Sequence, residues 1–292
     1  MGIASRPVGS LWVGDPISPY ERLSLASFAQ QGHETTLYSF TEQPGLPPSV
    51  RLGDAREVCP EDAVFNNVKR SFSFAMFSDW FRYRMIRDKG YVWADADLVC
   101  LAPLPNVDPL FAWNGPMELN SALLYAAPTS DLLAELVRRT EVLEDPATRD
   151  VAWGTYGPEL LTTVADELGL TRFALDIAAV YPISVVDMWR MFDPAWNDWC
   201  VAQTAGAITL HLWNSKIQQA GVKDMAPPIG SFLDDLMQHH EIEPPRRRIP
   251  LRWVREKRRQ KEGARATAPH GSSNLFRRLT GRLRASRQQG IA

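Results

Sequence analysis

The stretch SDWFRYRMIRDKGYVWADADLVCLAPLP, residues 78–105, is the main basis for predicting the fold from the sequence. Its first part has the composition of a helix, and Gly90 suits the position just after a helix C-terminus. The apolar run 91–94 then predicts a short buried strand. Two aspartates, Asp95 and Asp97, follow this strand directly. The stretch therefore predicts a helix, a buried strand and an acidic pair at the end of that strand.

The acidic pair is unfavourable without a partner, because burial and mutual repulsion both oppose the charged forms of two neighbouring carboxylates. Mg²⁺ or Mn²⁺ would remove both costs. These ions prefer oxygen ligands, and one or two carboxylates commonly hold them together with substrate phosphates. A D-x-D pair is by itself a weak motif, and a polar turn after a strand is the alternative interpretation. With its buried flanks, the pair Asp95 and Asp97 indicates a divalent-metal site.

This stretch resembles the central region of the glycosyltransferases with a DXD sugar-binding region, which include capsular-polysaccharide glycosyltransferases and alpha-1,4-galactosyltransferases. The positions that match the family pattern are Ser78, Asp79, Arg82, Tyr83, Gly90, Asp95 and Asp97. The resemblance extends in scattered motifs over about residues 10–215 of the chain. Two departures, Lys89 for a second glycine and Ala96 for a threonine, remove no ligand, although Ala96 removes a hydroxyl group.

The resemblance implies an α/β, GT-A-like nucleotide-sugar-binding fold, with a mixed central sheet flanked by helices. It implies transfer of a sugar from a nucleoside diphosphate sugar, which we expect to be a UDP-sugar, to a glycan or lipid-linked acceptor. Mn²⁺ or Mg²⁺ is the implied cofactor, and retention at the anomeric carbon is the implied outcome. Asp95, Asp97 and Arg82 are the implied catalytic residues. Asp79, Arg82 and Tyr83 are implied to bind the donor.

Further motifs along the chain match the same family. The implied substrate-binding residues among them are Trp12, Asn120, Gly157, Pro158, Glu159, Trp213 and Asn214. Trp12 would stack on the nucleotide base or pack in the core, and Asn120 would bind sugar hydroxyls or form a turn. Gly157 and Pro158 would open a helix whose free N–H groups can face an anion. His211 is implied as the third metal ligand or as a donor to the diphosphate.

The first forty residues predict a parallel strand–helix–strand unit. Residues 11–14 form a short apolar run, a helix is expected from Pro19, and residues 36–40 alternate as a strand does. The following residues, 41–72, are rich in proline and glycine in their first part and are expected to form a long connection. Residues 130–143 predict an amphipathic helix.

Composition limits the class of protein. The chain has 292 residues, of which 45% are apolar, enough for a substantial core. It contains no apolar run of about eighteen residues, and its N-terminus lacks the pattern of a signal peptide. The three scattered cysteines Cys59, Cys100 and Cys200 indicate a reducing compartment. We therefore expect a cytoplasmic protein without a transmembrane helix.

Charge divides the chain into two parts. Residues 1–240 carry 17 basic and 30 acidic side chains, whereas residues 241–292 carry 15 basic and 4 acidic ones. We therefore expect a catalytic domain over 1–240 and a basic, mostly flexible or loosely helical tail over 241–292.

One part of the tail predicts an amphipathic helix, because arginines surround an apolar stripe. The stripe consists of Leu275, Phe276, Leu279 and Leu283. Such a helix suits an anionic membrane surface, so peripheral contact with the inner face of the cell membrane is expected. Nucleic acid is not expected, because the tail lacks a recognised binding module. A solvated tail without a binding role is the alternative.

Two other function classes remain open at this stage. A phosphohydrolase of haloacid-dehalogenase type also uses a D-x-D pair after an apolar strand, and Asp234 and Asp235 would supply its late acidic pair. A non-catalytic nucleotide-sugar-binding protein is the second alternative. No covalent nucleophile stands out, and Asp187 and Asp193 are the candidates for that role.

Overall fold

The computed structural model describes residues 5–65, 74–150, 152 and 154–267, and the apolar stripe expected in the tail lies outside them. The strands are β1 (Val8–Trp12), β2 (Thr35–Ser39), β3 (Val50–Asp54), β4 (Val92–Ala94), β5 (Leu98–Cys100), β6 (Leu110–Gly115), β7 (Glu118–Tyr125) and β8 (Thr209–His211). The α-helices are α1 (Pro19–Gln30), α2 (Ala75–Lys89), α3 (Asp131–Thr140), α4 (Pro158–Glu167), α5 (Ile177–Val180), α6 (Asn197–Thr204), α7 (Asn214–Gln219), α8 (Phe232–His239) and α9 (Leu251–Thr267).

A six-stranded sheet with the order β3-β2-β1-β4-β7-β6 forms the centre of the fold. The strands β3, β2, β1 and β4 are parallel, whereas β7 and β6 are antiparallel to their neighbours. A separate antiparallel pair is formed by β5 and β8. This arrangement confirms the predicted α/β class with a mixed central sheet, and it is consistent with the GT-A-like fold that the resemblance implies.

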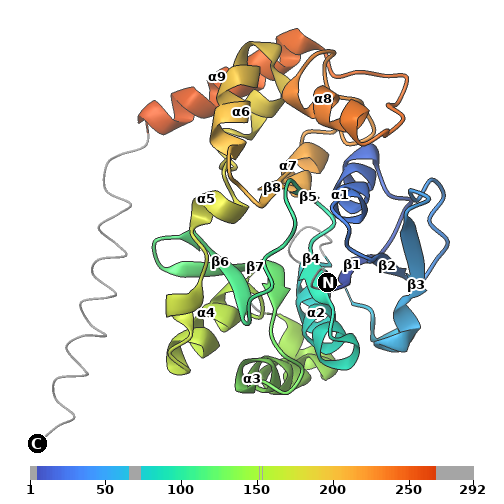
Figure 1. The fold of residues 1–292 in the computed structure, drawn as a ribbon, viewed down its shortest axis with the longest axis vertical. Coiled ribbons are helices and arrows are strands. Elements are labelled where there is room, and N and C mark those ends of the chain that lie inside the picture. Colours follow the sequence, from blue (N-terminus) through green and yellow to red (C-terminus); the bar gives the residue numbers. More distant parts are fainter. Residues whose placement is uncertain (1–4, 66–73, 151, 153, 268–292) are drawn as a thin grey trace, which may run out of the picture.

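Helices cover the sheet on both sides (Figure 1). The helix α2 packs on β1 and β4, α4 packs on β7, and α3 packs against both helices. On the other side, α1 packs on β2 and β5. Three further helices, α6, α8 and α9, gather at one end of the molecule, beyond the β5–β8 pair (Figure 1). The large apolar core lies between the sheet and α2, α3 and α4.

The predicted helix, glycine stop and strand are confirmed. The helix α2 ends at Lys89, and Gly90 adopts a left-handed conformation with φ of 67°, which costs glycine little because it has no Cβ. The Gly90 N–H donates to the Ile86 carbonyl at 2.9 Å. This turn delivers the buried strand β4 into the sheet directly before Asp95.

The predicted parallel unit at the N-terminus is also confirmed, with small shifts in its strands. Ser18 caps α1, and the Ser18 N–H donates to the Glu21 carboxylate at 2.8 Å in a capping box, with Pro19 in the first turn. The first strand covers Val8–Trp12, three residues earlier than the apolar run suggested. Its earlier residues include Gly9 and Ser10, whose weak apolar character hid the start of the strand.

The expectation of a long connection over residues 41–72 was wrong in one part. Residues Val50–Asp54 form β3, an edge strand parallel to β2. The side chains of Arg51 and Leu52 are exposed, so the strand has neither the apolar run nor the alternation that the sequence reading requires. This strand forms because its backbone pairs with β2, and no pattern in its own sequence predicts it.

The chain beyond residue 240 is packed where the structure describes it. Ile242, Ile249 and Val254 are buried in a second apolar cluster, and the Ile249 N–H donates to the Ala226 carbonyl at 2.9 Å. The ring of Trp253 on α9 lies edge-on to that of Trp189, with 5.2 Å between centroids. The expectation of a mostly flexible or loosely helical segment is therefore wrong for residues 242–254. The functional division at residue 240 stays a prediction.

None of the helices within the described ranges combines the length and the apolar character needed to cross a lipid bilayer.

Candidate active site

The two aspartates of the D-x-D pair lie in the turn where the chain leaves the central sheet. The Asp95 N–H donates to the Ala122 carbonyl of β7 at 2.7 Å, and the Leu98 N–H donates to the Asp95 carbonyl at 3.1 Å. These two bonds close a tight turn between β4 and β5. The turn follows the carboxyl end of a parallel strand, which is where ligands bind in open α/β sheets.

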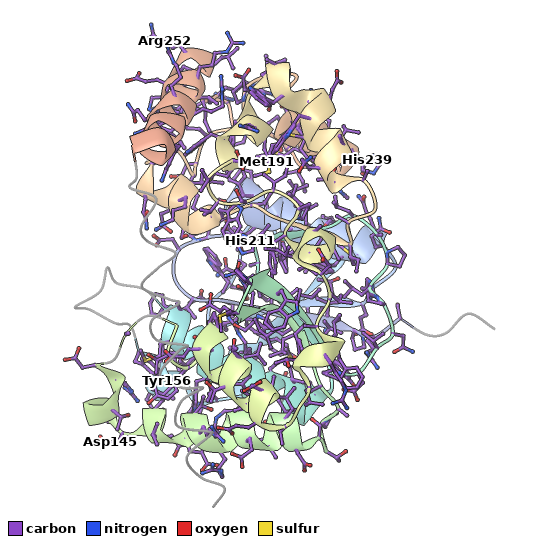
Figure 2. The ribbon with its side chains drawn as sticks, turned by 90° about the vertical axis from the view of Figure 1, so that its left-hand side faces the viewer. Asp145, Tyr156, Met191, His211, His239 and Arg252 are labelled. Atoms are coloured by element: carbon purple, nitrogen blue, oxygen red, sulfur yellow. The ribbon has the colours of Figure 1, made fainter. Side chains whose placement is uncertain are left out.

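A third potential ligand faces this turn from β8. Leu98 pairs with His211 in the β5–β8 register, which places the imidazole opposite the acidic pair. One ligand atom from each of Asp95, Asp97 and His211 lies within 4.8 Å of the other two. Ligands at about 2.0–2.1 Å from an Mg²⁺ ion are at most about 4.2 Å apart, so these three side chains are close to the spacing of a metal site and would draw together slightly around an ion. Figure 2 shows His211 near the middle of the molecule, between Met191 and Tyr156.

Charge in this region is unbalanced. Among the described residues, the acidic cluster of Asp79, Asp95 and Asp97 contains one buried cation, Arg82, whose guanidinium lies 3.2 Å from Asp79 Oδ1 and 3.1 Å from Asp95 Oδ1. Arg82 also donates to the Ser121 carbonyl at 2.9 Å. With His211 neutral, the part of the chain that the structure describes leaves two of the three negative charges uncompensated. A divalent cation would supply the missing charge, so the residues fit Mg²⁺ or Mn²⁺.

The pKa values in the cluster reflect this imbalance. Burial raises the pKa of Asp97, and Asp95 raises it further, although His211 opposes the shift. Burial raises the pKa of Asp79 to about 6, with Arg82 lowering it and Asp95 raising it. The protein therefore holds these carboxyl groups at a cost that a bound cation would offset.

His211 has a defined proton position in this conformation. The Trp213 N–H donates to His211 Nδ1 at 3.0 Å, so Nδ1 is an acceptor and the proton of the neutral ring is on Nε2. Nε2 lies 3.6 Å from Asp97 Oδ1. A metal bound through Nε2 would need the proton on Nδ1 and hence the loss of this bond. The observed hydrogen bond suits the second of the two expected roles of His211, a donor to the diphosphate, and ligation of a metal by His211 stays a prediction.

Trp213 holds this arrangement in place. Its backbone is left-handed with φ of 60°, an uncommon conformation for a bulky residue, and its ring lies 4.1 Å from that of His211. Trp213 Nε1 donates to the Ile183 carbonyl at 3.1 Å. Backbone strain of this kind costs roughly 1–3 kcal/mol and is concentrated at functional sites.

Asn214 links the D-x-D turn to helix α1. Its backbone N–H donates to Asp97 Oδ2 at 2.9 Å, and its side-chain Nδ2 donates to Glu21 Oε1 at 2.6 Å. Glu21 is 1% exposed and also pairs with Lys223 at 2.8 Å. The Lys223 ammonium lies 4.4 Å from the centre of the half-buried Trp12 ring at the end of β1. Glu21 and Lys223 were not predicted as site residues from the sequence. Glu21 is already accounted for by the capping box of α1, and an isolated lysine matches no binding motif.

The expected donor-binding residues of α2 are buried. Tyr83 is 0% exposed and donates from its hydroxyl to the Tyr156 carbonyl at 2.9 Å, whereas Asp79 is 6% exposed. A methyl group added at Gly157 would lie 2.7 Å from both carboxylate oxygens of Asp79. Gly157 and the buried Pro158 thus bring the N-terminus of α4 against Asp79, and this carboxylate is the anion next to that helix end. Direct contact of Asp79 and Tyr83 with a substrate stays a prediction.

Two further residues that were expected to bind substrate, Asn120 and Glu159, are less buried than Asp79 and Tyr83. Asn120 is half-buried on β7, and its Oδ1 accepts a hydrogen bond from the Ala122 N–H at 2.8 Å. Glu159 is exposed in the first turn of α4. A buried tyrosine that the sequence did not single out, Tyr181, lies with its ring 5.8 Å from that of His211.

Comparison with known proteins gives little further information. No protein-family model matches the chain, and no curated protein matches it. A solved structure described as "PaToxG Glycosyltransferase" is similar to 56% of this chain and 69% of its own chain, with 11% sequence identity and a TM-score of 0.44. A likeness of this extent is too weak to assign a fold family or an activity.

Proposed function

We propose that the chain is a metal-dependent glycosyltransferase that transfers a sugar from a nucleoside diphosphate sugar, preferably a UDP-sugar, to a hydroxyl group of a glycan or lipid-linked acceptor. The observation that carries this proposal is the acidic cluster with its two uncompensated charges at the carboxyl edge of the sheet. A divalent cation and a diphosphate together complete such a site. The resemblance to glycosyltransferases with a DXD region supports the same activity.

The chain's own residues have separable roles in this proposal. Asp95 and Asp97 would hold Mn²⁺ or Mg²⁺, which supplies Lewis-acid stabilisation of the departing diphosphate when it is bound. His211 would donate from Nε2 to a diphosphate oxygen. Arg82 fixes the Asp95 carboxylate through their 3.1 Å ion pair, and Asn214 fixes that of Asp97 through a backbone hydrogen bond.

The nucleotide would lie on the β1 side of this centre. Trp12 at the end of β1 would stack on the base, which contributes roughly 1–3 kcal/mol. Lys223 lies over the Trp12 ring, so base stacking requires this side chain to move aside or to contact the donor itself. Retention at the anomeric carbon follows from the resemblance alone. The candidate nucleophiles Asp187 and Asp193 are paired with Arg190 and Arg255 at 3.3 and 3.2 Å.

A thermal-shift panel tests the proposal. Wild-type protein is heated with UDP-, GDP- and other nucleotide sugars, each with and without Mn²⁺, and the matched Asp97→Asn variant is measured beside it. We expect one class of donor to raise the Tm of the wild type only when Mn²⁺ is present, and no such rise in the variant. If no donor shifts the Tm with metal present, the proposal is wrong. Release of free sugar or its transfer to an acceptor separates an enzyme from a non-catalytic binding protein.

We also propose that the protein is cytoplasmic and contacts anionic membrane lipids through its basic C-terminal part. Arg252 and Arg259 on α9 are exposed and lie seven residues apart, so they share one face of this helix. Full-length protein should co-sediment with phosphatidylserine vesicles, and a chain ending at Thr267 should bind more weakly. Truncation at residue 240 is unsuitable as a test, because it would remove the buried Ile249 and Val254. Equal binding by the full-length and shortened chains would exclude a contribution from residues 268–292.

A further inference from the structure

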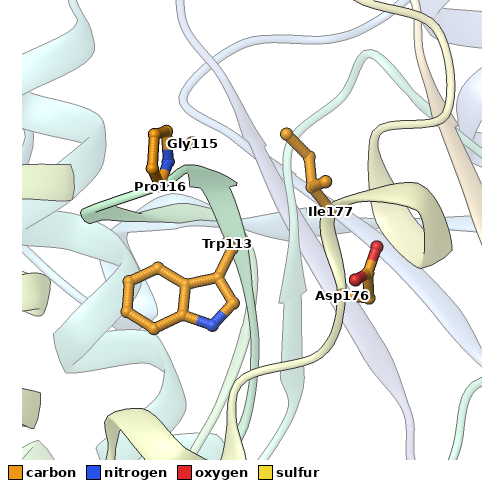
Figure 3. Close-up of a pocket in the computed structure, with 5 residues that line it drawn as sticks. All are labelled: Trp113, Gly115, Pro116, Asp176 and Ile177. Carbon is orange, nitrogen blue, oxygen red and sulfur yellow. The ribbon is translucent and has the colours of Figure 1, made fainter.

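A pocket of about 330 Å³ opens between the β6–β7 hairpin and the start of α5, and none of the sequence motifs accounts for it. It is lined by Trp113, Gly115, Pro116, Asp176 and Ile177 (Figure 3). The first three residues belong to the β6–β7 hairpin, and the other two lie at the start of α5. Figure 3 shows the Trp113 indole on one wall and the Asp176 and Ile177 side chains on the other.

Backbone hydrogen bonds fix the two walls relative to each other. The Trp113 N–H donates to the Leu175 carbonyl at 3.1 Å, and the Leu175 N–H donates to the Phe111 carbonyl at 2.9 Å. Ala112 and Leu175 form a parallel bridge between the same two segments. The pocket is therefore largely pre-formed, as ligand-binding sites usually are.

Both walls continue into the residues around the D-x-D turn. Along β7, the hairpin leads to Ala122, whose carbonyl accepts the Asp95 N–H. Along the other wall, α5 leads within a few residues to Tyr181, which contacts the His211 ring. In the sheet, β6 and β1 lie on opposite sides of β4. The pocket is thus on the side of the candidate metal site away from Trp12.

The chemistry of the lining favours a neutral, amphipathic ligand. An indole offers a flat apolar surface, whereas the Asp176 carboxylate accepts hydrogen bonds from hydroxyl groups. One Asp176 oxygen caps α5 by accepting the Ala178 N–H at 2.8 Å, and the residue is exposed. The five lining residues include one carboxylate and no cation, so a phosphate group would be repelled. A sugar ring, with C–H groups on its faces and hydroxyl groups on its rim, matches both walls.

We propose that this pocket is an acceptor subsite that holds a sugar ring of an uncharged glycan. The proposal rests on the proposed transferase function for its place in a reaction, but glycan binding itself can be measured without a donor. The donor nucleotide occupies the Trp12 side of the D-x-D turn and the acceptor occupies the hairpin side. The transferred sugar passes between them.

The experiment uses full-length protein on an array of defined neutral oligosaccharides, followed by titration of the best-bound oligosaccharide. We expect Trp113→Ala to weaken binding at least 10-fold. Asp176→Ser, which keeps a side chain able to cap α5, should weaken it about 3-fold or more. Met117→Ala is the matched control, because Met117 is 62% exposed at the hairpin tip and does not line the pocket.

Gly115→Leu is a second test of the pocket, which is needed in case the Trp113→Ala variant fails to fold. A methyl group added at Gly115 would meet nothing within 4 Å, and Gly115 lines the pocket, so we expect a leucine there to extend into the pocket. This variant should keep the wild-type Tm and lose glycan binding. Binding by both Trp113→Ala and Gly115→Leu at wild-type strength, or binding of no oligosaccharide by the wild type, would overturn the proposal.

Donor measurements separate this proposal from the one on which it rests. The Mn²⁺-dependent Tm rise with a nucleotide sugar should be unchanged in the Trp113 and Gly115 variants. If no donor binds but the pocket variants lose glycan binding, the transferase proposal is wrong and the sugar site stands. If donors bind and turn over while the pocket variants keep wild-type KM for the acceptor, the subsite proposal is wrong alone.

Discussion

Carboxylates at two places in the molecule, one buried and one partly exposed, are neutralised in different ways. In the α6–α9 end, Asp193 and Asp234 are each 1% exposed, and each has its own arginine partner. Arg255 lies 3.2 Å from Asp193, and Arg248 lies 2.6 Å from Asp234. At the D-x-D turn, Asp79 and Asp95 share Arg82, whereas Asp97 faces His211 at 3.6 Å and has no arginine or lysine partner among the described residues. A buried acid with a complete set of partners stabilises the fold, whereas a cluster with too few cations indicates a place for an ion.

Further hydrogen bonds hold the two carboxylates of the α6–α9 end. Asp193 caps a short helical turn by accepting the Ala195 N–H at 3.2 Å, and Asp234 accepts the Gly230 N–H at 2.9 Å and the Gln238 amide at 2.9 Å. These bonds give Asp234 a structural role, so it is poorly suited to be half of the late acidic pair that the phosphohydrolase alternative needs.

The largest effect is expected from Asp97→Asn. It removes a carboxylate from the proposed metal site, so Mn²⁺-dependent cleavage of the donor should fall about 10³-fold, as expected when one group that stabilises developing charge is lost. Initial rates with saturating donor provide the measurement. Asp234→Asn is the matched control and should keep the wild-type rate. Ion-dependent cleavage that survives in the Asp97→Asn variant would contradict the assignment of the metal site.

The next prediction concerns the free energy of unfolding, which replacement of an aspartate should change in opposite directions at the α6–α9 end and at the D-x-D turn. Asp234→Asn leaves Arg248 without its charge partner and should lower the free energy of unfolding by roughly 2–3 kcal/mol, less than for fully buried pairs because Arg248 is partly exposed. Without metal, Asp97→Asn relieves repulsion and should raise that free energy. Urea denaturation in EDTA measures both changes. Destabilisation by both variants to the same extent would remove the proposed difference between the regions.

Asp79 should make stability depend on pH. Its pKa is raised to about 6 in the folded protein from 3.8 in the unfolded chain, so between these values the folded state binds more protons. Stability contributed by the protonated carboxyl is therefore lost as pH rises towards 6. Between pH 4.5 and 7, the wild type should lose on the order of 2 kcal/mol relative to Asp79→Asn. Denaturation curves of both proteins at the two pH values test this, and parallel pH dependence would show that Asp79 titrates normally.

The smallest effect is expected from Gly157→Ala. The added methyl group would lie 2.7 Å from the Asp79 carboxylate, so α4 or Asp79 must shift, at a cost of roughly 1–2 kcal/mol. Gly115→Ala is the control, because its methyl group would enter open space. The difference in Tm between the two variants provides the measurement. Equal Tm values would mean that α4 or Asp79 can shift to make room for the methyl group without loss of stability.

Much of the site's framework was predictable from sequence. The order helix, Gly90, strand and Asp95-x-Asp97 is local, and each step has its own signal: a left-handed cap, a buried apolar run and adjacent carboxylates. The α1 capping box was equally readable. The resemblance added His211 and Asn214, and the structure brings both to the D-x-D turn. The structure also places Tyr83 and Asp79, two expected substrate contacts, in the interior. Residue type alone does not reveal whether such a side chain is buried.

By itself the sequence determined the α/β class, the position of the acidic pair and the unequal distribution of charge. Only the tertiary structure decided that Asp79 and Asp95 share Arg82, that Glu21 reaches Asn214 across 193 positions, and that Trp113 and Asp176 face one pocket. The reason is physical. Local patterns report the periodicity of helices and strands, whereas contacts between distant segments depend on the packing of whole elements and leave no repeated signal in either segment.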